Sequence, residues 1–486
     1  MEDKIQGFKN ACRERLDAFS LMQLRSYGRS IGVDVPTKKK KDELIAEIIA
    51  VLLGEVAPIE RSKRGAPVKD ERVDPEIGQA VAKLRYVWFA GIEPPVHLTY
   101  FESQVRTPLV VHASDNSMTY EQYYEQEIYA GQLEIIDDVP CLVDKGGDLS
   151  KERLLVSVEL IRQYGLREGD IITCHAFEKM GVRAAKNILS VNRVHPGTEK
   201  RFIFDDEPVV EPNKKISFTE NKPVNDAAKY MDFLFPIAYG QRCLVASAPK
   251  AGKSRYLCDL AKTISAEHRD RLLLALLVGQ SPERIAEYRS FVKKGNLVAT
   301  SYEDEAERHV FAAEFLFKRA KRMAEMGWEV VLVVDSLSQV AKAYNETDFS
   351  LGGKLLPCGL ESKTLHYIKK YFGAARCFPE HGSLTIIGGV SFGTGDAADD
   401  ALYTELSSVA NAEIRLSEEL SRRRVFPAVD VGLSYSECAE KLLNGQERAA
   451  EMAFRKRILN SEDGDFARQL LADCNTVEEF CEKSNR

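Results

Sequence analysis

The stretch that decides the fold is residues 242–264, which read RCLVASAPKAGKSRYLCDLAKTI. An apolar strand pattern leads into a short loop, and an amphipathic helical pattern follows it. Gly252 lets backbone N–H groups turn inward on a phosphate, Lys253 reaches the terminal phosphates, and the Ser254 hydroxyl can hold magnesium. Ser247 stands where such a loop usually has its first glycine. The pattern predicts a phosphate-binding loop for a nucleoside triphosphate.

A second motif follows downstream, VVLVVDS at residues 330–336. Its apolar strand pattern ends in the carboxylate of Asp335. In P-loop proteins a carboxylate at this place lies beside the hydroxyl ligand and orients the magnesium ion and its waters. An aspartate at a strand end can instead cap a turn. Taken with the phosphate loop upstream, the motif predicts that Ser254 and Asp335 are the metal-binding residues.

Apolar runs alternate with helical patterns around these motifs. Examples are LLLALLVG at residues 272–279, NLVATS at 296–301 and LTIIGGV at 384–390. Near-continuous apolar strands separated by helices indicate a parallel sheet that is covered on both faces. We therefore predict an α/β P-loop core at residues 199–440, followed by a helical segment at 441–486.

Smaller modules are predicted before this core. Residues 1–56 contain apolar helical patterns around a lysine-rich turn, and the lysines are either a solvated turn or a nucleic-acid contact. Residues 57–76 are charged and contain prolines, which predicts a linker. Residues 77–130 have no assigned function. Five short strand patterns in residues 131–198 predict an OB-like β-barrel, a fold that often binds single-stranded nucleic acid.

Composition limits the possible classes. The formal net charge of −7 gives no global reason to expect nucleic-acid binding, so any such binding must come from local patches. The N-terminus lacks the apolar core of a signal peptide, and no apolar run reaches the roughly 18 residues that a membrane span needs, so we expect a cytoplasmic protein. The 10 cysteines contain no C-x-x-C pair, which favours reduced thiols over a zinc site.

Several longer words of the core resemble the transcription termination factor Rho family in their order and approximate spacing. They are PKAGKS at 249–254, EAERHVFAAEFLFKRAKRM at 305–323, VVDSLSQVAKAYN at 333–345, KYFGAAR at 370–376, GSLTII at 382–387 and RRRVFPAVD at 422–430. A fainter likeness extends to residues 157–178 and 19–50. The resemblance implies a RecA-like core that binds ATP and Mg²⁺, forms a hexameric ring, and acts on single-stranded RNA and the RNA polymerase transcription complex.

Carried over position by position, the resemblance implies further roles. The residues implied to hold the triphosphate are Pro249, Lys250, Ala251, Gly252, Lys253 and Ser254. Asp335 would be the Walker B carboxylate, Phe426 would stack on the adenine, and Arg424 would lie at the subunit boundary near the phosphates. Lys354 lies in a segment that resembles a loop pointing into the ring's central hole, so it would contact RNA; an exposed surface lysine is the alternative.

The sequence departs from the family pattern at the catalytic positions. Gln280 occupies the place of the glutamate that polarises the attacking water, and an amide can orient a water but cannot take its proton. Ser281 replaces the arginine that follows. Glu437 falls, without gaps, where the family inserts an arginine finger into a neighbouring subunit, which reverses the charge needed at the transition state.

Two expected RNA-binding segments also differ. Residues 394–400 read TGDAADD, acidic and without the family's lysine, and residues 137–143 read DDVPCLV, without an aromatic to stack on a base.

The sequence leaves three candidate functions. The first is a Rho-type RNA-dependent ATPase and helicase. The second is a diverged paralogue that binds ATP, hydrolyses it poorly and acts as a regulator, and the third is a related ring enzyme such as a rotary-ATPase subunit. Nucleotide binding is a firmer prediction than hydrolysis.

Overall fold

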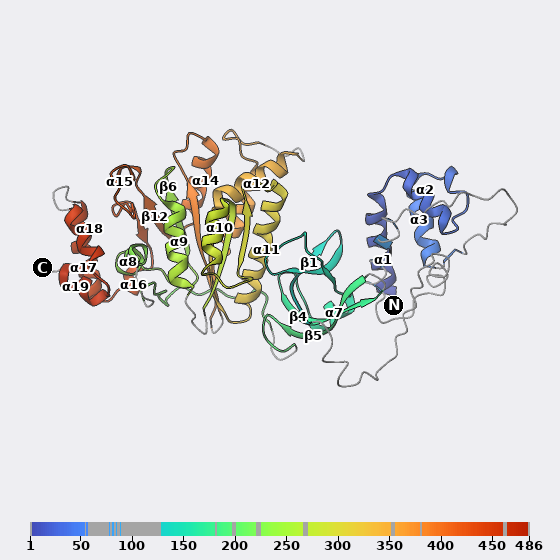
Figure 1. Cartoon of the computed structure of the whole chain (residues 1–486), viewed down its shortest axis with the longest axis horizontal. Helices are drawn as coiled ribbons and strands as arrows, with labels where there is room; N and C mark the ends of the chain where they lie inside the picture. The colour runs from blue at the N-terminus through green and yellow to red at the C-terminus, as the bar shows by residue number, and fades with distance from the viewer. Residues whose placement is uncertain are drawn as a thin grey trace. The chain divides into compact units, whose positions relative to one another are not determined.

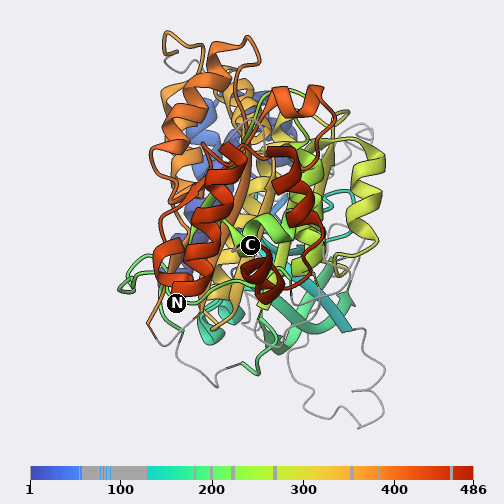
Figure 2. The same ribbon diagram turned by 90° about the vertical axis from the view of Figure 1, so that its left-hand side faces the viewer.

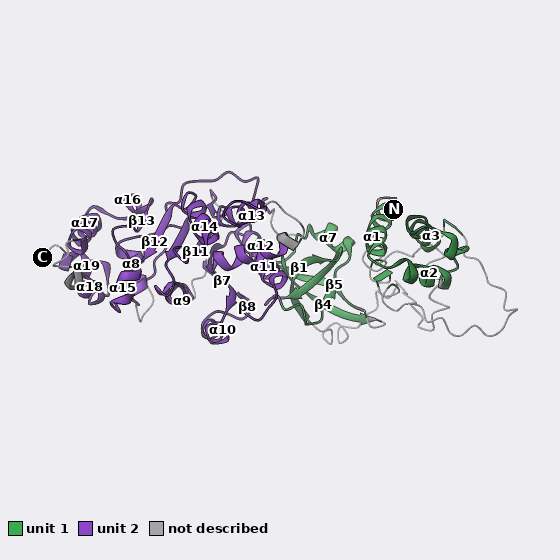
Figure 3. Ribbon diagram, turned by 90° about the horizontal axis from the view of Figure 1, so that it is seen from above, with its two compact units in different colours: residues 1–144, 148–199 green, residues 145–147, 200–486 purple. Residues whose placement is uncertain are grey.

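The computed structural model describes most of the chain. The described residues are 2–53, 55–56, 77, 80, 81, 84, 88, 128–179, 182–196, 201–219, 225–265, 271–350, 355–379, 382–459 and 464–484. The predicted linker at 57–76 and nearly all of 77–127 lie outside them. The chain divides into two compact units, residues 1–144 with 148–199 and residues 145–147 with 200–486 (Figure 3).

The N-terminal module of the first unit is helical. Its elements are α1 (Glu2–Asp17), α2 (Leu21–Ser30), the 3-10 turn η1 (Pro36–Lys38) and α3 (Lys41–Leu52). Ser20 caps α2 in a capping box with Gln23, which satisfies backbone donors at the helix start. Within the lysine run, Lys39 pairs with Glu47 and Lys41 pairs with Asp17. Part of that run's charge is therefore neutralised within the module.

The second part of this unit is a closed five-stranded barrel. Its strands are β1 (Ile128–Ile136), β2 (Val139–Asp144), β3 (Leu154–Leu155), β4 (Ile171–Lys179) and β5 (Val182–Val191), in the order β1-β2-β3-β5-β4. Helix α7 (Val158–Tyr164) lies between β3 and β4 in the chain. Asp137 and Asp138, both with positive φ, form the β1–β2 turn. The predicted OB-like barrel is confirmed.

The second unit contains an eight-stranded, mostly parallel sheet. Its strands are β6 (Arg242–Ser247), β7 (Arg271–Gln280), β8 (Leu297–Ser301), β9 (Glu329–Asp335), β10 (Arg376–Cys377), β11 (Ser383–Ser391), β12 (Ala412–Leu416) and β13 (Tyr435–Ser436). The order is β13-β12-β6-β11-β9-β7-β8, with β10 paired to β11. Strands β7, β9 and β11 are buried over almost their whole length, as a sheet covered on both faces requires.

Helices cover both faces of this sheet (Figure 1). One face shares a continuous apolar core with α8 (Asp226–Phe233), α9 (Lys253–Ile264) and α10 (Pro282–Arg289). The remaining helices of the domain are α11 (Ala306–Ala324), α12 (Leu337–Ser350), α13 (Ser362–Phe372), α14 (Ala397–Ser407) and the short α15 (Glu418–Arg422). Helices α11, α12 and α14 contact β11. The predicted α/β P-loop fold is confirmed.

The C-terminal helices belong to the same core. They are α16 (Ala439–Leu442), α17 (Gly445–Leu459), α18 (Gly464–Ala472) and α19 (Val477–Ser484), and α18 and α19 pack against α8 (Figure 2). The Phe480 ring stacks on Phe233 at 5.0 Å and meets Phe454 at 5.4 Å. No helix within the described ranges is both long and apolar enough to cross a bilayer.

Replacing Phe480 by alanine should destabilise the second unit by about 3–5 kcal/mol, because it leaves a cavity between three helices. The control is Met452→Ala in α17, whose side chain is exposed, and we expect a change within about 0.5 kcal/mol there. Urea unfolding followed by circular dichroism measures both. Equal effects of the two substitutions would contradict the packing role of Phe480.

Candidate functional site

The phosphate loop joins the end of β6 to the start of α9. Ser247 is buried as the last residue of β6, and Lys253 is the first of α9. Lys250 and Gly252 both adopt positive φ, 63° and 99°, so the backbone turns sharply twice within four residues. Glycine takes this conformation without strain. The turn leaves the N-terminus of a 12-residue helix at the loop, where backbone N–H groups and the helix dipole favour an anion.

Lys253 is held at the carboxyl edge of the sheet. Its Nζ donates a hydrogen bond to Ser391 Oγ at 2.6 Å. Gly389 makes room for its stem, since a Cβ at that position would lie 3.1 Å from Lys253 Cδ. Burial lowers the pKa of Lys253, while the carboxylates of Asp335 and Asp399 oppose that shift. The ammonium is therefore poorly solvated and would gain from an added anion.

Asp335 ends β9 in the middle of the sheet and is 0% exposed. Neither carboxylate oxygen accepts a hydrogen bond of good geometry from any described residue. Burial raises the pKa of Asp335, and the nearby Lys253 charge and Ser254 hydroxyl oppose this. Such an unsatisfied buried carboxylate beside a hydroxyl fits a hydrated magnesium ion, which binds through one or two protein oxygens.

Gln280 lies at the end of β7, the neighbour of β9. Its Nε2 donates to the backbone carbonyl of Asp335 at 3.2 Å, which places the Gln280 amide beside the end of β9. Ser281 does not point at the site as an arginine would. Its hydroxyl instead caps α10 by accepting a hydrogen bond from the Arg284 N–H.

Phe426 lies beside the phosphate loop, and Arg424 lies two residues before Phe426 in the chain. Phe426 is 52% exposed, and its ring lies 3.7 Å from where a Cβ of Gly252 would stand. The Ser421 hydroxyl donates to the Lys250 carbonyl at 3.0 Å, which ties α15 to the loop. Arg424 is exposed with a φ of 61°. An open aromatic face beside the loop is what a purine ring needs.

Two other predicted positions are not at this loop. Glu437 is exposed and lies near Arg242 at the start of β6, the end opposite the loop. Burial lowers the pKa of Arg242, and the Glu437 charge opposes that shift. The Glu437 backbone N–H donates to the Asn411 carbonyl, so Glu437 lies away from this loop. Lys354 lies outside the described residues.

The acidic segment 394–400 has a cationic partner that local sequence did not reveal. Lys342 of α12 contacts Asp399 at 3.2 Å and Asp396 at 3.9 Å. The Thr394 hydroxyl donates to Asp399, and the Gly393 N–H donates to Asp400. Lys342 and Ser391 are the site residues that sequence reasoning missed. The signal for Lys342 was present, because it lies in the VVDSLSQVAKAYN word.

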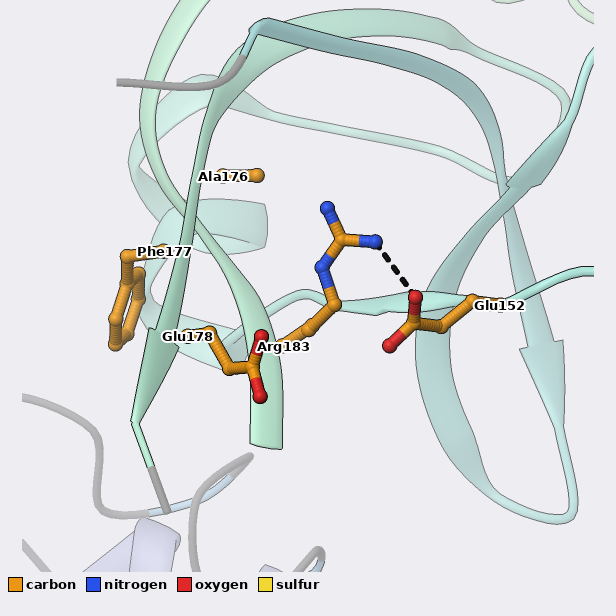
Figure 4. A pocket seen from close by; sticks show the side chains of 5 residues that line it. All are labelled: Glu152, Ala176, Phe177, Glu178 and Arg183. Atoms are coloured by element: carbon orange, nitrogen blue, oxygen red, sulfur yellow. Dashed lines mark hydrogen bonds and ion pairs between the residues drawn. The ribbon is translucent and has the colours of Figure 1, made fainter. Parts of the chain in front are cut away.

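A pocket of about 260 Å³ opens on the barrel of the first unit. It is lined by Glu152, Ala176, Phe177, Glu178 and Arg183 (Figure 4). Arg183 Nη1 donates to Glu152 Oε2 at 2.7 Å, and Figure 4 shows the two side chains facing one another across the opening. The opening therefore holds one arginine and two carboxylates, and one of these carboxylates, Glu152, pairs with the arginine.

Comparison with known proteins decides the family. Residues 227–436 match the family model for the ATP synthase alpha/beta family, nucleotide-binding domain. The transcription termination factor Rho of Salmonella typhimurium is 33% identical over 343 residues, which are 68% of this chain and 81% of that protein. The chain belongs to the Rho family.

Further Rho-family relatives agree. Rho of Borreliella burgdorferi is 36% identical over 63% of this chain, and the match spans 60% of that longer protein. Rho of Streptomyces coelicolor is 34% identical over 65% of this chain and 75% of its own length. A solved ATPase from the type III secretion system of pathogenic bacteria matches 62% of this chain at 20% identity with a TM-score of 0.49, too low to carry an argument.

Replacing Lys253 by alanine should weaken ATP binding about 10- to 100-fold, because a hydrogen bond to a charged group contributes roughly 1.5–3 kcal/mol. Titration of a fluorescent ATP analogue measures this. The matched control is Lys262→Ala, which removes the same charge from α9 where the lysine pairs with Glu287 at 2.7 Å. Equal affinity in the two variants would refute the assignment.

Proposed function

We propose that this Rho-family chain binds Mg-ATP and acts on single-stranded RNA as a ring in transcription termination. The observation that carries the proposal is that a poorly solvated Lys253 and the unsatisfied carboxylate of Asp335 lie near one another at the phosphate loop. An Mg-triphosphate supplies both missing partners, the anion for the lysine and the cation for the carboxylate.

The residues would divide the ligand between them. Backbone N–H groups of residues 249–254 and the Lys253 ammonium would hold the phosphates, and Phe426 would stack on the base. Ser254 and Asp335 would hold a magnesium ion, which screens phosphate charge when it is bound. Arg424 would face the phosphates at the boundary between two subunits.

For RNA we propose two contacts. At the barrel pocket, Arg183 would exchange its pairing with Glu152 for an RNA phosphate, and Phe177, whose ring points away from Arg183 in Figure 4, would stack on a neighbouring base. Lys354, in the segment that resembles the family's central loop, would contact RNA phosphates. The proposed partners are single-stranded RNA, further copies of this chain in a hexameric ring and the RNA polymerase transcription complex, all in the cytoplasm.

The Gln280 geometry favours a second candidate, a Rho-type regulator that binds ATP and turns it over slowly. The Gln280 amide is neutral, and its N–H₂ group is held by the Asp335 carbonyl. Its oxygen can orient a water but cannot accept a proton at neutral pH. Loss of a general base reduces rates about 10²–10⁴-fold while ATP binding stays intact.

Steady-state ATP hydrolysis with and without single-stranded RNA separates the two candidates. RNA-stimulated turnover that Lys253→Ala abolishes would identify a working motor, whereas tight ATP binding without turnover would identify the regulator.

We expect Gln280→Glu to raise turnover at least tenfold, because it restores a proton acceptor. Gln446→Glu adds the same charge at an exposed position of α17 and should change nothing. An unchanged rate in Gln280→Glu would contradict the role of Gln280.

Replacing Arg183 by alanine should weaken RNA binding and reduce the slope of log affinity against log salt by about 0.7, the value for one contact with a single strand. Arg162→Ala removes an equal charge from an exposed position of α7 and serves as the control. Fluorescence anisotropy of a labelled oligonucleotide at several salt concentrations measures both. A slope that does not differ between the variants would exclude the pocket as a phosphate contact.

A further inference from the structure

Strand β7 is interrupted by an irregularity just before Gln280. The pairing of β7 with β8 is regular from Ala275 to Leu277 and resumes, shifted, at Gln280 opposite Ser301. Gly279, between them, has a φ of 58°, which a side chain would strain. Such bulges re-aim the next side chain. Here the next side chain is Gln280, whose amide reaches the Asp335 carbonyl.

A chain of hydrogen bonds holds this bulge from outside the site. The Gly279 N–H donates to Thr300 Oγ1 at 3.3 Å. Thr300 is 1% exposed, and its Oγ1 lies 2.7 Å from His309 Nδ1 and 3.5 Å from the Leu277 carbonyl. His309 lies in the first turn of α11 and is partly exposed. The imidazole is thus linked through one buried hydroxyl to the backbone that carries Gln280.

We propose that His309 is a positioning residue for Gln280, acting through the Thr300 hydroxyl and the Gly279 bulge, and that its protonation reduces turnover. This inference rests on the proposed ATP site. Neither His309 nor Thr300 touches the nucleotide in this scheme; they set the direction of the Gln280 amide.

The Thr300 hydroxyl proton changes its acceptor when His309 is protonated. In the Nε2–H tautomer of the neutral imidazole, Thr300 donates its proton to His309 Nδ1 and accepts from the Gly279 N–H. Once the imidazole is protonated, Nδ1–H becomes a donor, so the Thr300 proton must turn to the Leu277 carbonyl. That carbonyl belongs to the strand segment just before the bulge. Protonation therefore reverses the hydrogen bond between Thr300 and α11, makes the imidazolium compete with the Gly279 N–H for the Thr300 oxygen, and turns the Thr300 proton to β7.

The charges around His309 set where this exchange occurs. Burial lowers the pKa of His309 below its ordinary value of 6.5, and Arg308 acts in the same direction. Asp304 and, from α12, Glu346 oppose the shift. The imidazole is therefore neutral at pH 7, and the arrangement that holds Gln280 is lost only as the pH falls through the lowered pKa.

Four variants test the proposal through the pH profile of turnover. Thr300→Val removes the hydroxyl at nearly constant volume and should lower kcat about 10- to 100-fold with the affinity for ATP unchanged, as misplacement of a reacting group does. Thr300→Ser keeps the hydroxyl, so its kcat should stay close to that of the wild type. His309→Asn keeps an amide near the Nδ1 position but cannot titrate, so it should retain turnover and lose the acidic decline. His309→Phe should resemble Thr300→Val.

Hydrogen–deuterium exchange of the 277–281 backbone in nucleotide-free protein gives a readout that needs no turnover. We expect faster exchange in Thr300→Val and His309→Phe and near-native exchange in Thr300→Ser. If the wild type hydrolyses no ATP, the hydrolytic part of the proposed function fails, yet the exchange result still decides the relay. Unchanged exchange in Thr300→Val, or an acidic decline that persists in His309→Asn, would overturn it.

Discussion

The site is organised around the buried carboxyl group of Asp335 at the centre of an apolar sheet. An unpaired ionised group in such surroundings costs several kcal/mol, and a structure tolerates it when a nearby group or a ligand compensates. Asp335 has Lys253 as its neighbour, and Lys253 has Ser391. The strands that deliver these residues, β9 and β11, are adjacent, and β6 lies next to β11 and leads to the helix of Lys253. The sheet order therefore brings these groups together at one edge.

The two halves of the site differ in how they depart from the family. The proposed phosphate half has the glycine, lysine and hydroxyl of such loops at residues 252–254. The proposed water-activating half carries an amide at Gln280, a helix-capping serine at Ser281 and, at the position that the resemblance gives to an arginine finger, the carboxylate of Glu437. Binding depends on summed contacts and survives such changes, whereas turnover depends on a single well-placed proton acceptor.

The sequence alone predicted much of the fold and part of the candidate site. Continuous apolar runs such as 272–279 and 330–335 predicted the buried parallel strands, and the spacing of short runs predicted the barrel. The sequence did not predict ion pairs and hydrogen bonds between distant segments, because these depend on which strands become neighbours. In the sequence, the acidic residues of 394–400 have no cationic partner nearby, whereas in the structure Lys342 of α12 forms an ion pair with Asp399. Likewise, the glycine before Gln280 gave no local sign that Thr300 would hold it, because the pairing of β7 with β8 creates that contact.

The hydrogen bond from Ser421 to the Lys250 carbonyl has a consequence for how such a protein can evolve. It joins the segment that carries Phe426 to the loop that carries Lys253, so in the proposed site base selectivity and phosphate affinity would share one mechanical linkage. Remodelling residues 421–427 toward another purine would then also disturb the contacts of the loop with the triphosphate. Selection on either trait alone is constrained by the other, and a change of preferred nucleotide would require paired substitutions on both sides of that bond.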